Sequence, residues 1–226
     1  ILASMAFNSR VTDAEVATEG ITKISKWDIL YAKEFGYEIK SVGIAKCEDG
    51  DIEVRVHPVM LPQSHPLATV ADSYNAVFVE GNALGKAMFY GRGAGAYPTA
   101  SAVVGDLINA SRNILHHCAN RWGCTCYLQR RIKPMAETVS KYYVRMNVLD
   151  QPGVLAAITD KMGINGVSLD AVIQKRRLED GKAEIVMITH MVKHANMMQA
   201  MTEIENLSCV STVASIIRVE GNDDEC

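Results

Sequence analysis

Hydrophobic and polar positions repeat along the chain with two different periods. In residues 26–36 the apolar side chains fall at helical spacing, with Ser25 ahead of the first turn and Gly36 as a stop signal. Residues 38–48 and 51–61 are β-like runs joined by an Asp-Gly turn, which is a hairpin signal. In the second run charged residues alternate with apolar ones. This alternation predicts a strand with one face exposed to water.

The rest of the first part continues in the same way. The opening residues have a helix-like apolar pattern, and residues 14–20 predict a short helix capped by Thr12 or Asp13. Residues 75–82 and 86–93 predict a second strand pair. A helix is predicted from Thr99 to about Ile114. A helical entry followed by mostly antiparallel strands indicates an α+β fold.

The second part of the chain has a regular order of elements, β-α-β-β-α-β, which is the ferredoxin-like order. The predicted elements are strand 141–150, helix 153–166, strands 167–176 and 183–192, helix 193–207 and strand 210–221. We expect a first domain over residues 1–115, a linker over 116–140, this second domain over 141–221 and a disordered tail over 222–226.

Composition narrows the functional class. The chain has 226 residues, 48% hydrophobic and 22% charged, with a net charge of −3, so nothing favours nucleic acid as a partner. No apolar run reaches the ~20 residues that span a membrane. Six scattered cysteines without a secretory signal favour reduced thiols and a cytoplasmic location. Because the chain opens inside a helical pattern without a Met, we expect it to be a fragment of a longer protein.

The glycine-rich stretch GRGAGAYPT, residues 91–99, is similar to a dinucleotide phosphate-binding fingerprint. That fingerprint follows the first strand of a βαβ unit and needs an acidic residue about 20 positions later. Neither condition is plainly met. A second candidate, the His116–Cys126 segment, has Cys124 and Cys126 at the wrong spacing for a structural zinc site, and we assign no metal site.

The motif LDQPGVL, residues 149–155, stands where the first strand of the second part meets its first helix. Pro152 fixes φ, Gly153 allows tight backbone geometry, and the N–H groups at the helix start can hold a carboxylate. Asp150 is placed to receive an amino group. Motif and topology together resemble the ACT domain, a regulatory module that binds amino acids.

The ACT resemblance implies that the ligand lies between the loop of one copy and the strand start of a partner. The effector-binding residues it implies are Asp150, Pro152, Gly153, Val154, Leu155, Asn165 and Ser168. The alternative, that the ACT domains pair structurally without any ligand, stays open.

Several motifs of the first part occur in the order that homoserine dehydrogenases have near their C-terminus. They are EGITKIS, DILYAKEFGYEIK, GIAK, HPVMLP, HPLATV, NAVFVEGNALG and MFYGRGAGAYPTASAVVGDL, and they cover residues 1 to about 115. This resemblance implies an enzyme that interconverts L-homoserine and aspartate semialdehyde with NADP or NAD. It also implies that the ACT domain senses an end product, with threonine as the favoured effector.

The same resemblance gives the glycine turn a role beside the nicotinamide end of the cofactor, through Gly93, Ala94 and Gly95. The catalytic lysine and the substrate-binding acidic residues of the family lie upstream of Ile1, so we assign no catalytic residue and expect this chain alone to be inactive. A homo-oligomer, dimer or tetramer, is implied through the strand region, burying Val77, Val79, Met88 and Phe89. The alternative from another class is a non-catalytic amino-acid-binding regulatory protein.

Overall fold

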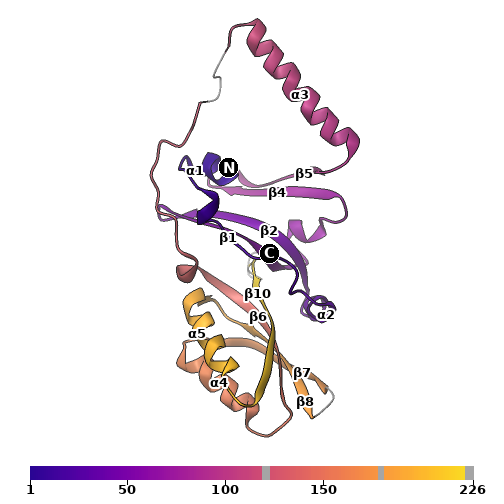
Figure 1. The fold of residues 1–226 in the computed structure, drawn as a ribbon, viewed down its shortest axis with the longest axis vertical. Coiled ribbons are helices and arrows are strands. Elements are labelled where there is room, and N and C mark those ends of the chain that lie inside the picture. The colour runs from indigo at the N-terminus through magenta and orange to yellow at the C-terminus, as the bar shows by residue number, and fades with distance from the viewer. Residues whose placement is uncertain (119–122, 178–180, 222–226) are drawn as a thin grey trace.

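The computed structural model describes residues 1–118, 123–177 and 181–221, so the predicted tail at 222–226 lies outside the described residues (Figure 1). In the first part the helices and strands are α1 (Leu2–Phe7), η1 (Asp13–Glu15), β1 (Ala17–Thr18), α2 (Lys26–Glu34), β2 (Tyr37–Glu48), β3 (Asp51–Pro62), η2 (Pro66–Thr69), β4 (Tyr74–Gly81), β5 (Gly85–Arg92) and α3 (Ala96–Leu115). In the second part they are η3 (Met135–Glu137), β6 (Val139–Leu149), α4 (Val154–Ile164), β7 (Leu169–Arg177), β8 (Lys182–Thr189), β9 (Val192–Lys193), α5 (His194–Glu205) and β10 (Val210–Val219).

One mixed sheet runs through both parts of the chain. Its strand order is β1-β3-β10-β6-β8-β7, with β2 paired to β3 and β9 paired to β6. The two parts join where β10 runs parallel to β3, with Arg218 opposite Val59 and Val219 opposite Met60. This confirms the predicted α+β class and the ferredoxin-like order. The sequence pattern did not predict that the two sheets would be continuous.

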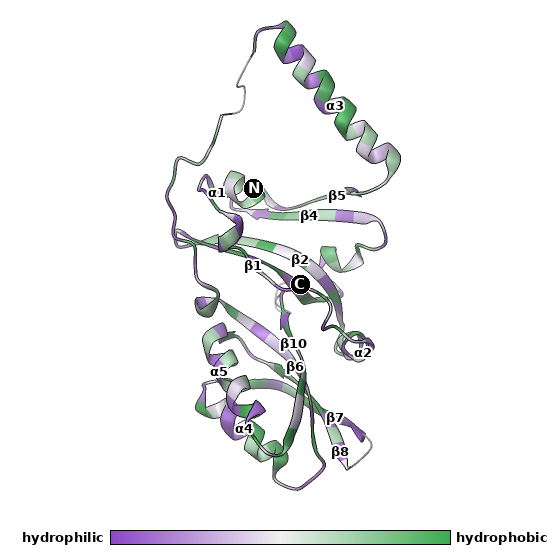
Figure 2. Cartoon of the chain, viewed as in Figure 1, coloured by the Kyte–Doolittle hydropathy of each residue, from purple (hydrophilic) through white to green (hydrophobic). Residues whose placement is uncertain are grey.

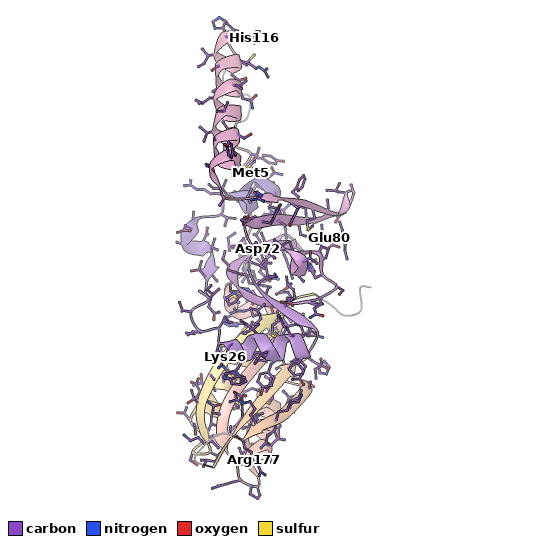
Figure 3. All side chains as sticks on the ribbon, turned by 90° about the vertical axis from the view of Figure 1, so that its right-hand side faces the viewer. Met5, Lys26, Asp72, Glu80, His116 and Arg177 are labelled. Carbon is purple, nitrogen blue, oxygen red and sulfur yellow. The ribbon has the colours of Figure 1, made fainter. Side chains whose placement is uncertain are left out.

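The four strands β10, β6, β8 and β7, called the ACT sheet below, are covered on both faces. On one face α4 and α5 pack over a core that includes Val144, Met146 and Ile158 (Figure 1). On the other face α2 of the first part packs its Tyr31 against Tyr143 and Ile188. Figure 3 shows α2, marked by Lys26, lying against these strands. The ACT sheet is therefore built into the first part rather than tethered to it.

The prediction that one face of β3 is exposed to water is wrong. Glu53, Arg55 and His57 are all buried, with Arg55 only 1% exposed. Arg55 forms ion pairs with Glu53 and with Glu220, the residue that follows β10. The alternating charges are therefore paired and covered by the second part of the chain.

The predicted helix over residues 14–20 is also wrong. Thr12 and Glu15 form the capping box of a single 3₁₀ turn, and β1 follows at once. Ala17 and Thr18 pair with Arg55 and Val56 of β3 in parallel. The β-branched residues of this stretch favour a strand once a sheet edge is available.

Helix α3 begins at Ala96, three residues earlier than predicted, because Pro98 is tolerated in a first turn whose N–H groups have no helical partner. The segment is a regular helix with no buried residue. Figure 2 shows apolar residues along it, away from the sheet. In the described ranges, no helix has the length and apolar character needed to cross a bilayer.

The segment predicted as a linker follows the edge of the first part in its described residues. Leu128 donates its N–H to the carbonyl of Asn8, and Ile52 exchanges backbone hydrogen bonds with Arg131 and Lys133. Arg131 also forms ion pairs with Asp51 and Glu137. Arg131 thus attaches this segment to the start of β3.

We predict opposite effects of alanine at two glycines of one helix. Gly153, which precedes α4, has φ +88°, and alanine there should lower the free energy of unfolding by ~1–2 kcal/mol because L residues avoid this region. Gly163, inside α4 with open space around it, should tolerate alanine with a gain of ~0.4–1 kcal/mol. Urea unfolding of the two variants measures both; changes of the same sign would contradict the α4 boundary.

His57 should make stability depend on pH. Burial, together with nearby Arg218 and Arg55, lowers its pKa from 6.5 to about 4. Between these two pH values His57 binds a proton in the unfolded chain but not in the folded one. Its contribution to the free energy of unfolding is therefore complete above about pH 6.5 and is lost as the pH falls towards 4, by up to ~3 kcal/mol. Urea unfolding at several pH values should show a shallower loss for His57→Gln. His116→Gln, at the exposed tip of α3 (Figure 3), should keep the wild-type slope, and identical slopes for both variants would contradict this assignment.

Candidate functional site

The glycine turn leads directly from β5 into α3. A Cβ at Gly93 would lie 2.1 Å from the side-chain nitrogen of Asn75, so a side chain at this position would displace Asn75. Gly95 has φ +125° and precedes α3 without any side-chain cap. The turn therefore needs glycine at two positions, at Gly93 because Asn75 fills the space of a side chain and at Gly95 because of its positive φ.

A hollow opens where this turn meets the first two turns of α3. It is lined by Gly93, Ala94, Gly95, Ala96, Thr99, Ala100, Val103 and Val104. The backbone N–H groups of Ala96 and Tyr97 have no partner within the helix, and a helix start favours negative or electron-rich groups. The apolar side chains of α3 form the other wall. The hollow thus combines the backbone of the turn with apolar side chains of α3.

The second candidate site is the loop between β6 and α4. The N–H of Asp150 donates to the carbonyl of Gly181 at 2.9 Å. Its carboxylate accepts a hydrogen bond from Gln174 at 3.4 Å and forms an ion pair with Nε of Arg177 at 3.2 Å. Gln174 and Arg177 were not among the predicted site residues. The strand order could have indicated them. Because β6 and β7 both run antiparallel to β8, their C-terminal ends lie at the same end of the sheet, which brings the last residues of β7 close to Asp150.

The remaining loop residues form the start of α4. Pro152 is exposed, and Gly153 takes the left-handed conformation that precedes the helix. Val154 is buried in the core under α4 and α5, whereas Leu155 is 40% exposed. Val154 therefore anchors the loop, and Leu155 and the free N–H groups of the helix start are open to a ligand.

Asn165 and Ser168 lie at the other end of α4. Asn165 donates a side-chain hydrogen bond to the carbonyl of Lys161 at 2.9 Å, and the carbonyl of Ser168 accepts from the N–H of His190. Since α4 has 11 residues, its two ends are roughly 16 Å apart, with Gly153 before one end and Asn165 after the other. A single chain therefore does not bring the two halves of the predicted effector site together.

The predicted oligomer surface on β4 and β5 is split between two faces. Val77 is directly opposite Phe89, and Val79 is opposite Ala87, so these apolar side chains share one face of the hairpin. Phe89 is 67% exposed. Met88 is opposite Phe78 and lies on the other face with Tyr90. The four residues predicted for the interface thus divide between the two faces of the hairpin, with Met88 on one face and the other three on the opposite face.

Over residues 1–118, 123–177 and 181–221, no three His, Cys, Asp or Glu side chains gather as metal ligands. The cysteines in these ranges, among them Cys124 and Cys126, are free thiols.

Comparison with known proteins finds two families that match this chain. Residues 1–108 match the family described as homoserine dehydrogenase, and residues 142–209 match the ACT domain. The homoserine dehydrogenase of Synechocystis is 41% identical over 97% of this chain and 52% of its own length. That of Corynebacterium glutamicum is 40% identical over 97% of this chain and 50% of its own length.

A solved structure agrees. The homoserine dehydrogenase from Thiobacillus denitrificans superposes with a TM-score of 0.87 at 35% identity, over 97% of this chain and 51% of its own. The chain spans about half the length of the curated relatives it matches. It belongs to the homoserine dehydrogenase family, and it corresponds to the C-terminal region of these enzymes with its ACT domain.

Proposed function

We propose that this chain is the cofactor-contacting and regulatory part of an enzyme that interconverts L-homoserine and aspartate semialdehyde with NADP or NAD. The observation that carries the proposal is the unbroken similarity, 41% identity over 97% of the chain, to a homoserine dehydrogenase. The hollow at the glycine turn and the incomplete effector loop add support from geometry. The chemistry of hydride transfer belongs to the nicotinamide when it is bound.

The glycine turn has a limited role in this proposal. Gly93 and Gly95 allow the backbone to approach the nicotinamide end, and the start of α3 presents free N–H groups there. The apolar side of α3 then packs against the part of the enzyme that holds the rest of the cofactor. Its exposed Val103, Leu107 and Ile108 support this docking, because contiguous apolar surface marks an interaction site.

The effector site is proposed to need two copies of the chain. In the described part of the chain β7 pairs only with β8, so its outer edge is available to another strand. A second copy whose β7 runs antiparallel to the first would bring its own Asn165 and Ser168 towards the loop of Asp150. An amino acid bound there would place its ammonium group at Asp150 and its carboxylate at the start of α4. L-threonine is the proposed effector.

We also propose that β4 and β5 self-associate. A two-stranded hairpin is marginally stable on its own, and this one exposes Val77, Val79 and Phe89 on one face. Pairing with the same face of a second copy would bury these side chains in a symmetric interface.

The dehydrogenase function predicts the behaviour of a chimera. The part of the Synechocystis enzyme that precedes the aligned region is joined to residues 1–226 of this chain. The chimera should reduce NADP⁺ or NAD⁺ when given L-homoserine, whereas this chain alone should not. Gly93→Ala should raise the KM for the cofactor about tenfold, since ~1.4 kcal/mol of contact energy corresponds to that factor. Gly91→Ala, where a Cβ has open space, should leave it unchanged.

Two results would count against this function. One is a chimera that melts cooperatively but has no homoserine-dependent activity. The other is an equal loss for Gly91→Ala and Gly93→Ala, which would remove the glycine turn from the cofactor site. In the first case a non-catalytic amino-acid-binding role becomes the better explanation.

If the ACT domain senses an amino acid, this chain should bind that amino acid even though it does not catalyse a reaction. Calorimetric titration of L-threonine into this chain should release heat, and Asp150→Asn should weaken binding about tenfold because a charged hydrogen bond is lost. Asp160→Asn, on the exposed side of α4, is the matched control and should bind as the wild type does. If threonine, methionine, lysine and isoleucine all give no heat, the sensing role is wrong.

A further inference from the structure

A buried group of polar side chains joins helix α2 of the first part to the ACT sheet. Arg145 of β6 is at its centre, and Nε lies 2.7 Å from Oδ1 of Asp28 on α2. On its other side Nη1 lies 3.0 Å from Oε2 of Glu184 on β8. Asp28 has no exposed surface, and Arg145 and Glu184 are 6% and 2% exposed. One guanidinium thus holds two carboxylates from two different parts of the chain.

Three hydroxyl groups complete this arrangement. Tyr31 donates to Glu184 at 2.7 Å, Tyr143 donates to Asp28 at 3.1 Å, and Ser25 accepts from Nη2 of Arg145 at 2.9 Å. We call this set the Arg145 cluster: Ser25, Asp28, Tyr31, Tyr143, Arg145 and Glu184. Because every member has partners, the cost of burying its charges is offset by ion pairs and hydrogen bonds.

The titration of the cluster is consistent with a tightly held set of charges. Burial acts to raise the pKa of Asp28, but hydrogen bonds from Arg145 and Ser25 outweigh it and hold that pKa below its ordinary value. Burial and the neighbouring Glu184 raise the pKa of Tyr31 to about 12. The carboxylate therefore stays charged and the phenol stays neutral at any physiological pH.

At the rim, Arg176 of β7 shields the cluster from water. Its guanidinium lies 3.5 Å from the ring centre of Trp27, and Nη1 reaches Glu184 at 3.4 Å. With Arg176 included, two positive charges face two negative ones. Three of the four strands of the ACT sheet thus contact α2 through this one group.

The cluster is directly connected to the proposed effector loop. Arg145 is five residues before Asp150 on β6, and the carbonyl of Gly181, just before β8, accepts the N–H of Asp150. Strand β6, which carries Arg145, therefore ends at this loop, and strand β8, which carries Glu184, begins beside it. A displacement of the loop moves the backbones that position the two sides of the cluster.

On the other side, the cluster controls the start of α2. Asp28 is the third residue of this helix, and its carboxylate accepts hydrogen bonds from the N–H and hydroxyl of Ser25 in a capping box. The same carboxylate binds Arg145. Helix α2 then passes through Gly36 into β2, which pairs with β3 along its whole length. A change in the position of Arg145 therefore acts directly on the first turn of α2, which belongs to the first part of the chain.

We propose that the Arg145 cluster is the coupling element through which the effector loop of the ACT domain influences the catalytic part of the protein. Charge pairs in a low-dielectric interior tolerate little displacement, so a shift of β6 or β8 must be followed by α2 or must break the cluster. An exposed ion pair cannot do this, because water replaces its partners at little cost. That this coupling serves regulation rests on the proposed effector site. The mechanical coupling between the loop and α2 does not depend on that site.

Hydrogen exchange of this chain tests the coupling without any ligand. In Asp28→Asn the four backbone amides within residues 150–154, where Pro152 has none, should exchange about tenfold faster than in the wild type, although they lie beyond the end of β6. Tyr31→Phe removes only the hydrogen bond to Glu184 and should also raise the exchange rates of these amides. This second variant decides the question if Asp28→Asn does not fold. Glu34→Gln is the matched control, because Glu34 is on the same helix and pairs with Lys175 of β7 at an exposed position. It should leave residues 150–154 unchanged.

The outcomes separate this proposal from the proposed function. Faster exchange in α2 alone, with residues 150–154 unchanged in both Asp28→Asn and Tyr31→Phe, would overturn the coupling. An equal response to Glu34→Gln would overturn it as well. Titration of L-threonine forms a second arm: affinity should change several-fold in Asp28→Asn and not in Glu34→Gln. If the wild type binds no threonine, the sensing function fails, while the exchange result still decides the coupling.

Discussion

The structure depends on a guanidinium that is almost completely removed from water. Arg145 is stable there only because Asp28 and Glu184 supply two carboxylates at hydrogen-bonding distance. Losing Asp28 would remove the ion pair at Nε of Arg145, and breaking a buried ion pair by removing one partner is strongly destabilising. Asp28 belongs to the first part and Glu184 to the ACT sheet. The buried charge therefore requires both parts to fold against each other, and the parallel contact between β3 and β10 extends that union along the sheet.

This union arranges the candidate sites at separate places on one framework. The effector loop begins at the end of β6, where Asp150 follows the strand that carries Arg145, and the glycine turn lies beyond β5 on the other side of the molecule (Figure 1). Neither site is complete in one chain: the hollow at α3 has an exposed apolar wall, and Asn165 is an α-helix away from Gly153. Between the two places runs one continuous sheet, with α2 packed against its ACT strands.

Local signals predicted much of this fold. The Asp-Gly turn between β2 and β3, the Ser25 cap of α2 and the glycine that precedes α4 each act within a few residues, and the structure has all three. The predictions were wrong where the structure of a segment depends on residues far away in the sequence. Arg55 in β3 alternates with apolar residues as a surface charge does, but Glu220, one of its two partners, is 165 positions away. Arg145 in β6 is buried for a similar reason, since its partner Asp28 is 117 positions away. Likewise, the pairing of Ala17 with β3 overrode a weak helical pattern.

A double-mutant cycle between Asp28 and Arg145 tests the central claim most directly. The free energy of unfolding is measured for the wild type, Asp28→Asn, Arg145→Met and the double variant. If the ion pair joins the two parts, each single variant should lose ~3–5 kcal/mol and the double variant far less than their sum, with a coupling energy of ~2–3 kcal/mol. Additive losses, with a coupling energy below ~0.5 kcal/mol, would show that α2 and the ACT sheet are held together by apolar packing alone and would contradict this account.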